Sequence, residues 1–141
     1  MSVSASVAAF RSALALAWLV FQMYIMFEPL HPMVARPIHV FIAIVAAFLW
    51  QPLGERAWQK ALDWLLILAS FATLGYYLVS QHRLIERMEN VDPVFLQDMV
   101  FGALAILLIL EATRRVIGWS LLGVILAFIA YGFLGPWFPG W

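Results

Sequence analysis

Hydrophobic residues are concentrated in five long stretches, and short polar segments separate these stretches. The stretches cover residues 8–27, 38–53, 60–79, 94–111 and 118–135. A helix crosses ~30 Å of hydrocarbon with about 20 mostly apolar residues, and with fewer when amphipathic side chains anchor its ends. Because lipid cannot satisfy exposed backbone groups, each stretch is expected to be an α-helix. The pattern predicts an all-α integral membrane bundle, a single domain over residues 1–141, with five spans or, alternatively, four.

Composition supports a membrane protein. Of the 141 residues, 65% are hydrophobic and 11% are charged, whereas soluble domains are about 45–50% apolar and about 25% charged. The formal net charge is zero, which gives no indication of a nucleic-acid partner. The chain has no cysteine, so disulfides, thiolate metal sites and cysteine nucleophiles are excluded.

Prolines and polar residues predict where the spans end. The first apolar run is longer than the core of a cleaved signal peptide, so it is expected to remain as a span that ends at Glu28-Pro29. Arg36-Pro37 is expected to open the second span, because proline is tolerated in the first turn of a helix. Residues 80–93 are mostly polar but carry apolar residues at helical spacing, which predicts a short amphipathic segment at the membrane interface.

The basic residues predict the orientation of the chain. One side of the predicted bundle collects Arg11, Arg56, Lys60, Arg114 and Arg115. The other side collects Arg36, Arg83 and Arg87. Since cytoplasmic loops carry an excess of Lys and Arg, the N-terminus is expected in the cytoplasm and the end of the fifth span outside.

Few residues are candidates for chemistry. His31, His39 and His82 are expected in loops or at the first turn of a span, all on the outer side, which favours interface histidines over a haem or metal site. The middles of the spans carry no charge and no glycine beside a proline, unlike the discontinuous helices that bind substrate in secondary transporters. We therefore expect no catalytic, metal or substrate site, no cofactor and no enzymatic activity.

Asp98 is the best candidate for an ionisable residue within a span. It lies about one turn into the fourth stretch, where Arg83 or Arg87 could reach it. An intramembrane carboxylate is a functional candidate by default. Here a structural ion pair, or a carboxylate at the level of the lipid headgroups, is favoured over ion or proton handling.

The segment Glu111–Gly118 is the densest polar segment between two spans. Glu111 and Arg115 are four residues apart, so they can pair on one face of a helix. Arg114 would then be available for lipid phosphates or for the carbonyls of a partner. A positive-inside anchor and a partner-docking turn both remain open. Glu111, Arg114, Arg115 and Gly118, together with Asp98, are the structural or docking candidates.

The same segment carries a resemblance to a known family. The string Leu110-Glu-Ala-Thr-Arg-Arg-Val-Ile-Gly-Trp119, followed by an apolar span and by Gly135-Pro-Trp-Phe-Pro-Gly140, resembles the tripartite ATP-independent periplasmic (TRAP) transporter permeases, and among them the TAXI branch. Arg36-Pro-Ile-His39 and Asp63-Trp-Leu65 are similar to the second and third spans of that family. The resemblance covers roughly residues 36–140.

This resemblance implies a small membrane subunit that scaffolds a large one in the bacterial inner membrane. In the family, the large subunit holds the sodium and substrate sites, and a periplasmic substrate-binding protein delivers the solute, often a carboxylate. The expected partners are these two proteins and membrane lipids. In fused TAXI permeases a large transport domain follows, whereas this sequence stops at Trp141, so a separate small subunit and a truncated fusion are both open. Family small subunits usually have four helices, so the fifth stretch would correspond to the joining segment of the fusions.

Two other functions remain as alternatives to the scaffold. The first is a membrane anchor subunit of a redox enzyme, which would need facing histidines or a polar cluster at the midplane. The second is a stand-alone channel or exporter that works as an oligomer.

Overall fold

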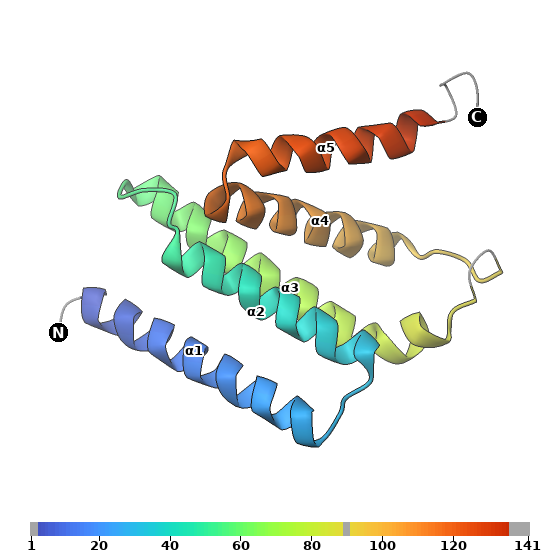
Figure 1. Ribbon diagram of the computed structural model, residues 1–141, viewed down its shortest axis with the longest axis horizontal. Helices are drawn as coiled ribbons and strands as arrows, with labels where there is room; N and C mark the ends of the chain where they lie inside the picture. Colours follow the sequence, from blue (N-terminus) through green and yellow to red (C-terminus); the bar gives the residue numbers. More distant parts are fainter. Residues whose placement is uncertain (1–2, 89–90, 136–141) are drawn as a thin grey trace.

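The computed structural model describes residues 3–88 and 91–135, with side chains from residue 6 onward. The described residues form five helices and no strand: α1 (Val3–Phe27), α2 (Pro32–Trp50), α3 (Ala57–Glu86), α4 (Leu96–Val116) and α5 (Trp119–Leu134) (Figure 1). The predicted all-α architecture is thus confirmed. The segment Pro136–Gly140, which contributes to the resemblance, lies outside the described residues.

Four of the helices, α1 to α4, are long and apolar enough to cross a membrane. The fifth, α5, has 16 residues, which corresponds to ~24 Å at the helical rise of ~1.5 Å per residue. This is shorter than the ~30 Å of a typical hydrocarbon core. The chain is a multi-pass membrane protein with four full-length apolar helices and a shorter apolar fifth.

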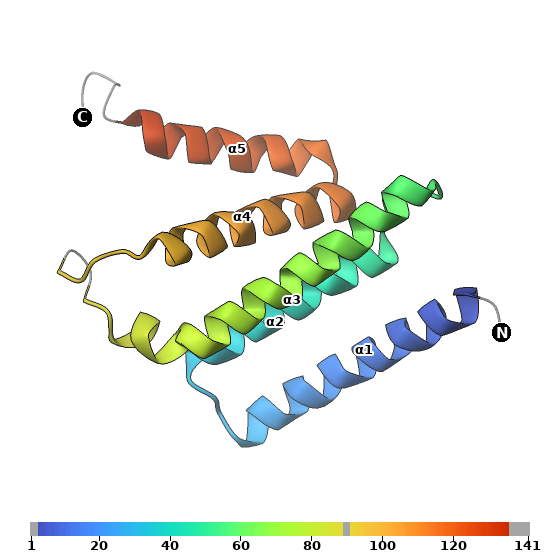
Figure 2. The ribbon, with the colours of Figure 1, turned by 180° about the vertical axis from the view of Figure 1, so that it is seen from behind.

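Helices α2, α3 and α4 pack against one another and form the centre of the bundle. Among the described residues, α1 packs only on α2, and α5 packs only on α4. Figures 1 and 2 show α1 and α5 on opposite sides of this centre. We call the end with the α2–α3 and α4–α5 connections the α2–α3 end, and the end with the α1–α2 and α3–α4 connections the α3–α4 end.

The core lies along one stripe of α2. Its buried residues recur at the i, i+3, i+4, i+7, i+8 spacing of one helix face, which brings them all onto the side that meets α3 and α4. The stripe consists of Phe41, Ile44, Val45, Phe48 and Leu49. Ile67 of α3 and Leu108 of α4 pack on it. In lipid, such contacts stabilise the bundle through van der Waals packing rather than through the hydrophobic effect.

The prediction that Arg36-Pro37 opens the second helix is wrong. Helix α2 begins at Pro32, and Pro37 lies inside it. His31 precedes the helix and its Nδ1 accepts a hydrogen bond from the Met33 N–H at 3.3 Å. Pro37 has no N–H, so the Met33 carbonyl lacks its helical donor. The hydroxyl of Tyr77 in α3 donates to that carbonyl instead.

The amphipathic segment expected near residues 80–93 is not a separate helix. Residues 80–86 are the last turns of α3, which has 30 residues and is therefore ~45 Å long. Because this exceeds the ~30 Å of hydrocarbon, polar turns at its ends can lie in the headgroup layer. Residues 89–90 of the expected segment lie outside the described part of the chain.

Helix α4 extends beyond the predicted end of the fourth span, to Val116. Glu111, Arg114 and Arg115 are therefore helical residues, and only Ile117 and Gly118 connect α4 to α5. The segment predicted as a polar turn is mostly the last turn of a helix.

Candidate functional site

Arg115 is the centre of a buried polar cluster at the α2–α3 end. Its Nη1 donates to Oδ1 of Asp63 at 2.6 Å and to the Gln51 carbonyl at 3.3 Å, and its Nε donates to Oε1 of Glu111 at 2.7 Å. The Arg115 side chain is only 4% exposed. We call Asp63, Glu111, Arg114 and Arg115 the Arg115 cluster.

Asp63 ties this cluster to α3 and to the connection before it. One carboxylate oxygen pairs with Arg115, and the other, Oδ2, accepts from the Leu53 N–H at 3.1 Å. The guanidinium also lies over the ring of Phe48 in α2, with 4.8 Å from its central carbon to the ring centroid, a cation–π geometry. A single side chain on α4 thus contacts all three central helices. In the sequence, Asp63 was noted only as the first residue of the Asp63-Trp-Leu65 resemblance.

The predicted Glu111–Arg115 pair is present, and Arg114 also pairs with Glu111. Arg114 is about a quarter exposed, and its Nε and Nη2 donate to the two oxygens of Glu111, each at 2.8 Å. Its guanidinium also lies 5.5 Å from the ring centroid of Trp119, the first residue of α5. Arg115 therefore points into the bundle, and Arg114 lies against the start of α5.

Gly118 permits the abrupt connection between α4 and α5. Its φ of 99° and ψ of −173° lie in a region that is essentially restricted to glycine. The Thr113 carbonyl accepts from the N–H groups of Ile117 and Gly118, at 2.9 and 3.4 Å, which closes the end of α4. Gly118 thus has a structural reason to be glycine.

Arginines from two helices cap the C-terminal end of α2. Arg11 of α1 donates to the Leu49 carbonyl, and Arg115 donates to the Gln51 carbonyl. The last carbonyls of a helix lack helical donors and carry partial negative charge, so cations stabilise this end.

Nearby, Lys60 pairs with Glu55 at 2.8 Å on the exposed surface. The hydrogen bond and charge of Lys60 hold the pKa of Glu55 below its usual value.

Asp98 forms a second polar group at the α3–α4 end. Arg83 donates from Nη1 and Nη2 to its two oxygens at 2.8 and 2.7 Å, and the Tyr76 hydroxyl donates to Oδ1. The Asp98 side chain is 8% exposed. The Tyr76 ring stacks on Phe101, with 4.1 Å between centroids. The predicted pairing with Arg83 is therefore present, and it joins α3 to the first turn of α4.

The histidines take part in separate local contacts. His39 of α2 accepts at Nδ1 from Trp18 at 3.2 Å and from Gln22 at 2.7 Å, and these donors come from α1. His82 pairs with Glu86 at 3.0 Å. Within residues 3–88 and 91–135, no three histidine, aspartate or glutamate side chains are grouped as potential metal ligands. The sequence did not reveal that His39 links α2 to α1.

Polar residues in the middle of α3 are satisfied within the helix. The hydroxyls of Ser70 and Thr73 donate to the Leu66 and Ala69 carbonyls, both at 2.8 Å. Both residues are buried. These two hydroxyls therefore need no partner from another helix.

No protein family, curated protein or solved structure gives a significant match to this chain.

Proposed function

We propose that this chain is a small, non-catalytic scaffold subunit of a sodium-coupled TRAP-type transporter in the bacterial inner membrane. Its partners would be a large membrane subunit and a periplasmic substrate-binding protein, and the transported solutes would be organic, mainly carboxylates. The residues that support this proposal are those of the Leu110–Trp119 segment, because they carry the resemblance to TAXI-type permeases.

The observation that carries the proposal is that the charged side chains of the Leu110–Trp119 segment hold the helices of this chain together. Its charged side chains bind within the chain: Arg115 joins α2, α3 and α4, and Arg114 lies against the start of α5. Helices held in a fixed arrangement at their ends suit a supporting subunit. The Arg83–Asp98 pair fixes α3 to α4 at the opposite end.

The outer helices supply a wide apolar surface for lipid or for a partner. Large side chains of α1 and α5 are strongly exposed, among them Met26 (78%), Phe128 (72%) and Phe133 (81%). Because α1 and α5 lie on opposite sides of the centre, they extend the width of the protein in the membrane plane (Figures 1 and 2). A broad apolar perimeter would resist movement along the membrane normal while a bound transport subunit moves.

Under this proposal, some of the candidate residues have a structural role and others could contact the large subunit. Arg115 is too deeply buried to meet a partner, so its role is structural. Glu111 and Arg114 are about a quarter exposed and could contact the large subunit beside Trp119. Asp98 belongs to the structural group, because its oxygens are taken by Arg83 and Tyr76.

The test is isolation of the tagged protein from its native membrane in mild detergent. We expect a large polytopic protein to co-purify, and we expect sodium-driven uptake of a carboxylate only when both chains and a binding protein are reconstituted. A large subunit that assembles and transports at full rate without this chain would exclude the scaffold. Ion flux through liposomes that contain this chain alone would favour the channel alternative, and a haem absorption spectrum would favour the redox anchor.

A further inference from the structure

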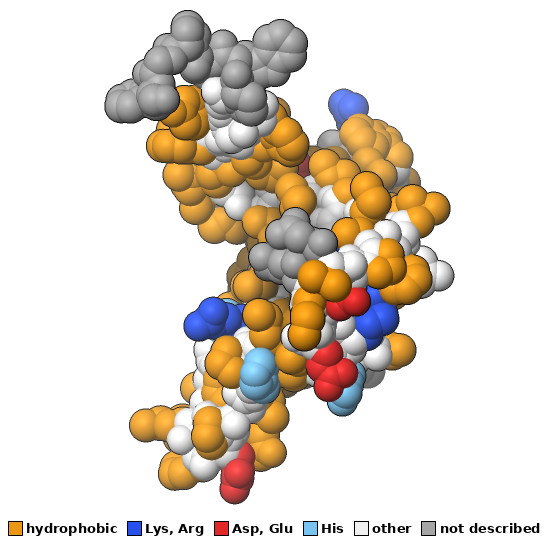
Figure 3. Space-filling model, turned by 90° about the vertical axis from the view of Figure 1, so that its right-hand side faces the viewer, with side chains coloured by type: hydrophobic (Ala, Val, Ile, Leu, Met, Phe, Trp, Pro, Cys, Tyr) orange, Lys and Arg blue, Asp and Glu red, His pale blue; other side chains and the backbone are white. Residues whose placement is uncertain are grey.

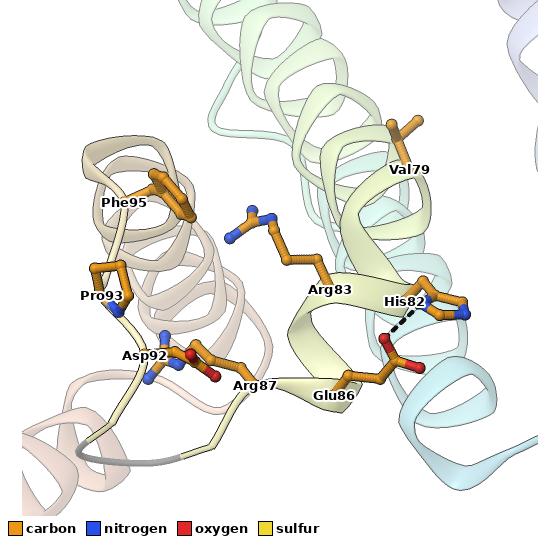
Figure 4. A pocket seen from close by; sticks show the side chains of 8 residues that line it. All are labelled: Val79, His82, Arg83, Glu86, Arg87, Asp92, Pro93 and Phe95. Atoms are coloured by element: carbon orange, nitrogen blue, oxygen red, sulfur yellow. Dashed lines mark ion pairs between the residues drawn. The ribbon is translucent and has the colours of Figure 1, made fainter.

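An open pocket of about 550 Å³ lies at the α3–α4 end. It is formed by the last turns of α3 and by the segment that leads into α4. Figure 4 shows Arg83 and Arg87 reaching from the end of α3 toward the segment that carries Asp92 and Phe95. The pocket therefore has basic, acidic and apolar walls.

A second cavity, of about 180 Å³, lies between the central helices next to this pocket. Its walls are mostly apolar and include Phe41 of α2 and Phe101, Gly102 and Ala105 of α4. A Cβ added at Gly102 would meet no atom within 4 Å. The absence of a side chain at Gly102 thus helps to keep this crevice open.

The hydrogen-bonded group of Arg83, Asp98 and Tyr76 lies at the boundary between the two cavities. Arg83 lines the pocket, whereas Asp98 and Tyr76 line the crevice. Arg83 donates to both oxygens of Asp98 and, at 3.1 Å, to the Tyr76 hydroxyl. An amphiphilic molecule could place its polar part in the pocket and an apolar chain in the crevice.

The position of the pocket favours a membrane lipid as the occupant. The pocket is lined by the last two turns of α3, and this helix is ~45 Å long. Since the hydrocarbon is only ~30 Å thick, these turns are expected at the level of the headgroups. Figure 3, which views this end, shows acidic, basic and histidine side chains among hydrophobic ones.

The charges of the pocket favour a headgroup with both signs. Arg83 is engaged by Asp98 and Tyr76, which leaves Arg87 as the guanidinium suited to a phosphate. The carboxylates of Glu86 and Asp92 also line the pocket and would repel a purely anionic headgroup. Each has one oxygen in use, Oε2 of Glu86 with His82 and Oδ2 of Asp92 with the Met88 N–H, so Oε1 and Oδ1 are the acceptors that remain. They suit an ammonium group that can donate hydrogen bonds, which a primary amine can do and a quaternary amine cannot.

From this arrangement we infer a binding site for one zwitterionic phospholipid with a primary amine, of the phosphatidylethanolamine class. Arg87 binds the phosphate, Asp92 and Glu86 accept from the ammonium, and one acyl chain enters the crevice beside Gly102. This site is independent of the transporter proposal, because it rests only on contacts within this chain.

The test is native mass spectrometry of the full chain released from nanodiscs with equal amounts of phosphatidylethanolamine, phosphatidylglycerol and phosphatidylcholine. The Gly102→Leu variant should fill the crevice. Gly123→Leu is its matched control, because Gly123 of α5 also has no atom within 4 Å of an added Cβ. Arg87→Gln removes the phosphate donor, and Arg36→Gln removes another arginine predicted on the same side.

We expect one retained phosphatidylethanolamine per wild-type chain, in preference to the other two lipids. Its retention should fall at least about fivefold in Arg87→Gln, as for the loss of one charge-assisted hydrogen bond. It should also fall in Gly102→Leu, but not in either control. Equal retention in Gly102→Leu and Gly123→Leu would overturn the proposal. A preference of the wild-type protein for phosphatidylglycerol or phosphatidylcholine would also overturn it, and this measurement requires no variant.

Discussion

The hydroxyl of Tyr77 donates a hydrogen bond to the backbone carbonyl of Met33, 44 residues earlier in the chain. This carbonyl would accept from residue 37 in an uninterrupted helix, but residue 37 is proline. A side chain on α3 thus replaces a missing backbone donor on α2 and fastens the two helices at the α3–α4 end.

Tyr77→Phe is expected to destabilise the protein by about 1 kcal/mol, the typical net value of one hydrogen bond. In a Pro37→Ala background the same substitution should cost less, because alanine at this position would supply a backbone N–H to the Met33 carbonyl. Unfolding in detergent titrations of the four proteins gives the interaction energy. Tyr24→Phe, at an exposed tyrosine of α1, serves as the control. Equal costs in the two backgrounds would show that the hydroxyl does not compensate for Pro37.

Arg115→Met is expected to destabilise the protein by about 3–5 kcal/mol, because it leaves the buried Asp63 carboxylate without its cation. Adding Asp63→Leu should recover much of this loss, since two apolar side chains leave no charge unpaired. Lys60→Met, which removes an exposed pair with Glu55, should change stability little. The same detergent titration measures these three variants and the single variant Asp63→Leu. A double variant as unstable as the sum of its single variants would argue against direct coupling of Arg115 and Asp63.

Gly118→Ala is expected to cost about 1–3 kcal/mol, because its backbone conformation is strained for any residue with a Cβ. No neighbouring atom lies within 4 Å of the added carbon, so the cost comes from the backbone alone. Gly123→Ala and Gly132→Ala, both within α5, should be neutral or stabilising by about 0.5–1 kcal/mol. Thermal unfolding compares the three variants. Loss of stability at all three positions would assign the effect to α5 packing instead.

His39→Phe is expected to loosen α1 from the rest of the bundle. The substitution removes the acceptor shared by Trp18 and Gln22, and α1 packs only on α2 among the described helices. Hydrogen exchange of α1 amides should become faster, while exchange in α3 and α4 should be unchanged. His82→Phe, at an exposed ion pair, is the control. Unchanged α1 exchange in His39→Phe would mean that apolar packing and Arg11 are sufficient to hold α1.

The absence of cysteine makes the predicted orientation directly testable. Asp92→Cys should react with a membrane-impermeant maleimide in intact cells, because its loop is predicted to lie outside. Glu55→Cys should react only after the membrane is permeabilised. The reverse labelling pattern would place the N-terminus outside.

The sequence predicted the helices well and their ends less well. Long apolar runs determine where helices form in lipid, so all five stretches correspond to observed helices. Helix ends depend on backbone hydrogen bonds that hydropathy does not report. Pro37 is tolerated inside α2 because Tyr77 supplies a donor, and α3 continues past its apolar stretch into polar residues.

The polar contacts were predictable where the partners lie on one helix or on either side of one loop, as Arg83 and Asp98 do. Glu111 and Arg115 pair because a helix places residues four apart on one face. The same rule also allows pairs three residues apart, yet the contact between Glu111 and Arg114 was not predicted. The Arg115–Asp63 pair joins residues 52 positions apart, and it depends on how α3 and α4 pack.

That separation also has a consequence for biosynthesis. Asp63 leaves the ribosome well before Arg115, so α3 would enter the bilayer with a carboxylate that has no cation to neutralise it. Burying an unpaired charge in lipid is costly. Helices α3 and α4 are therefore expected to remain together at the insertion machinery and to enter the lipid as a hairpin, with the completed ion pair as the condition for their release.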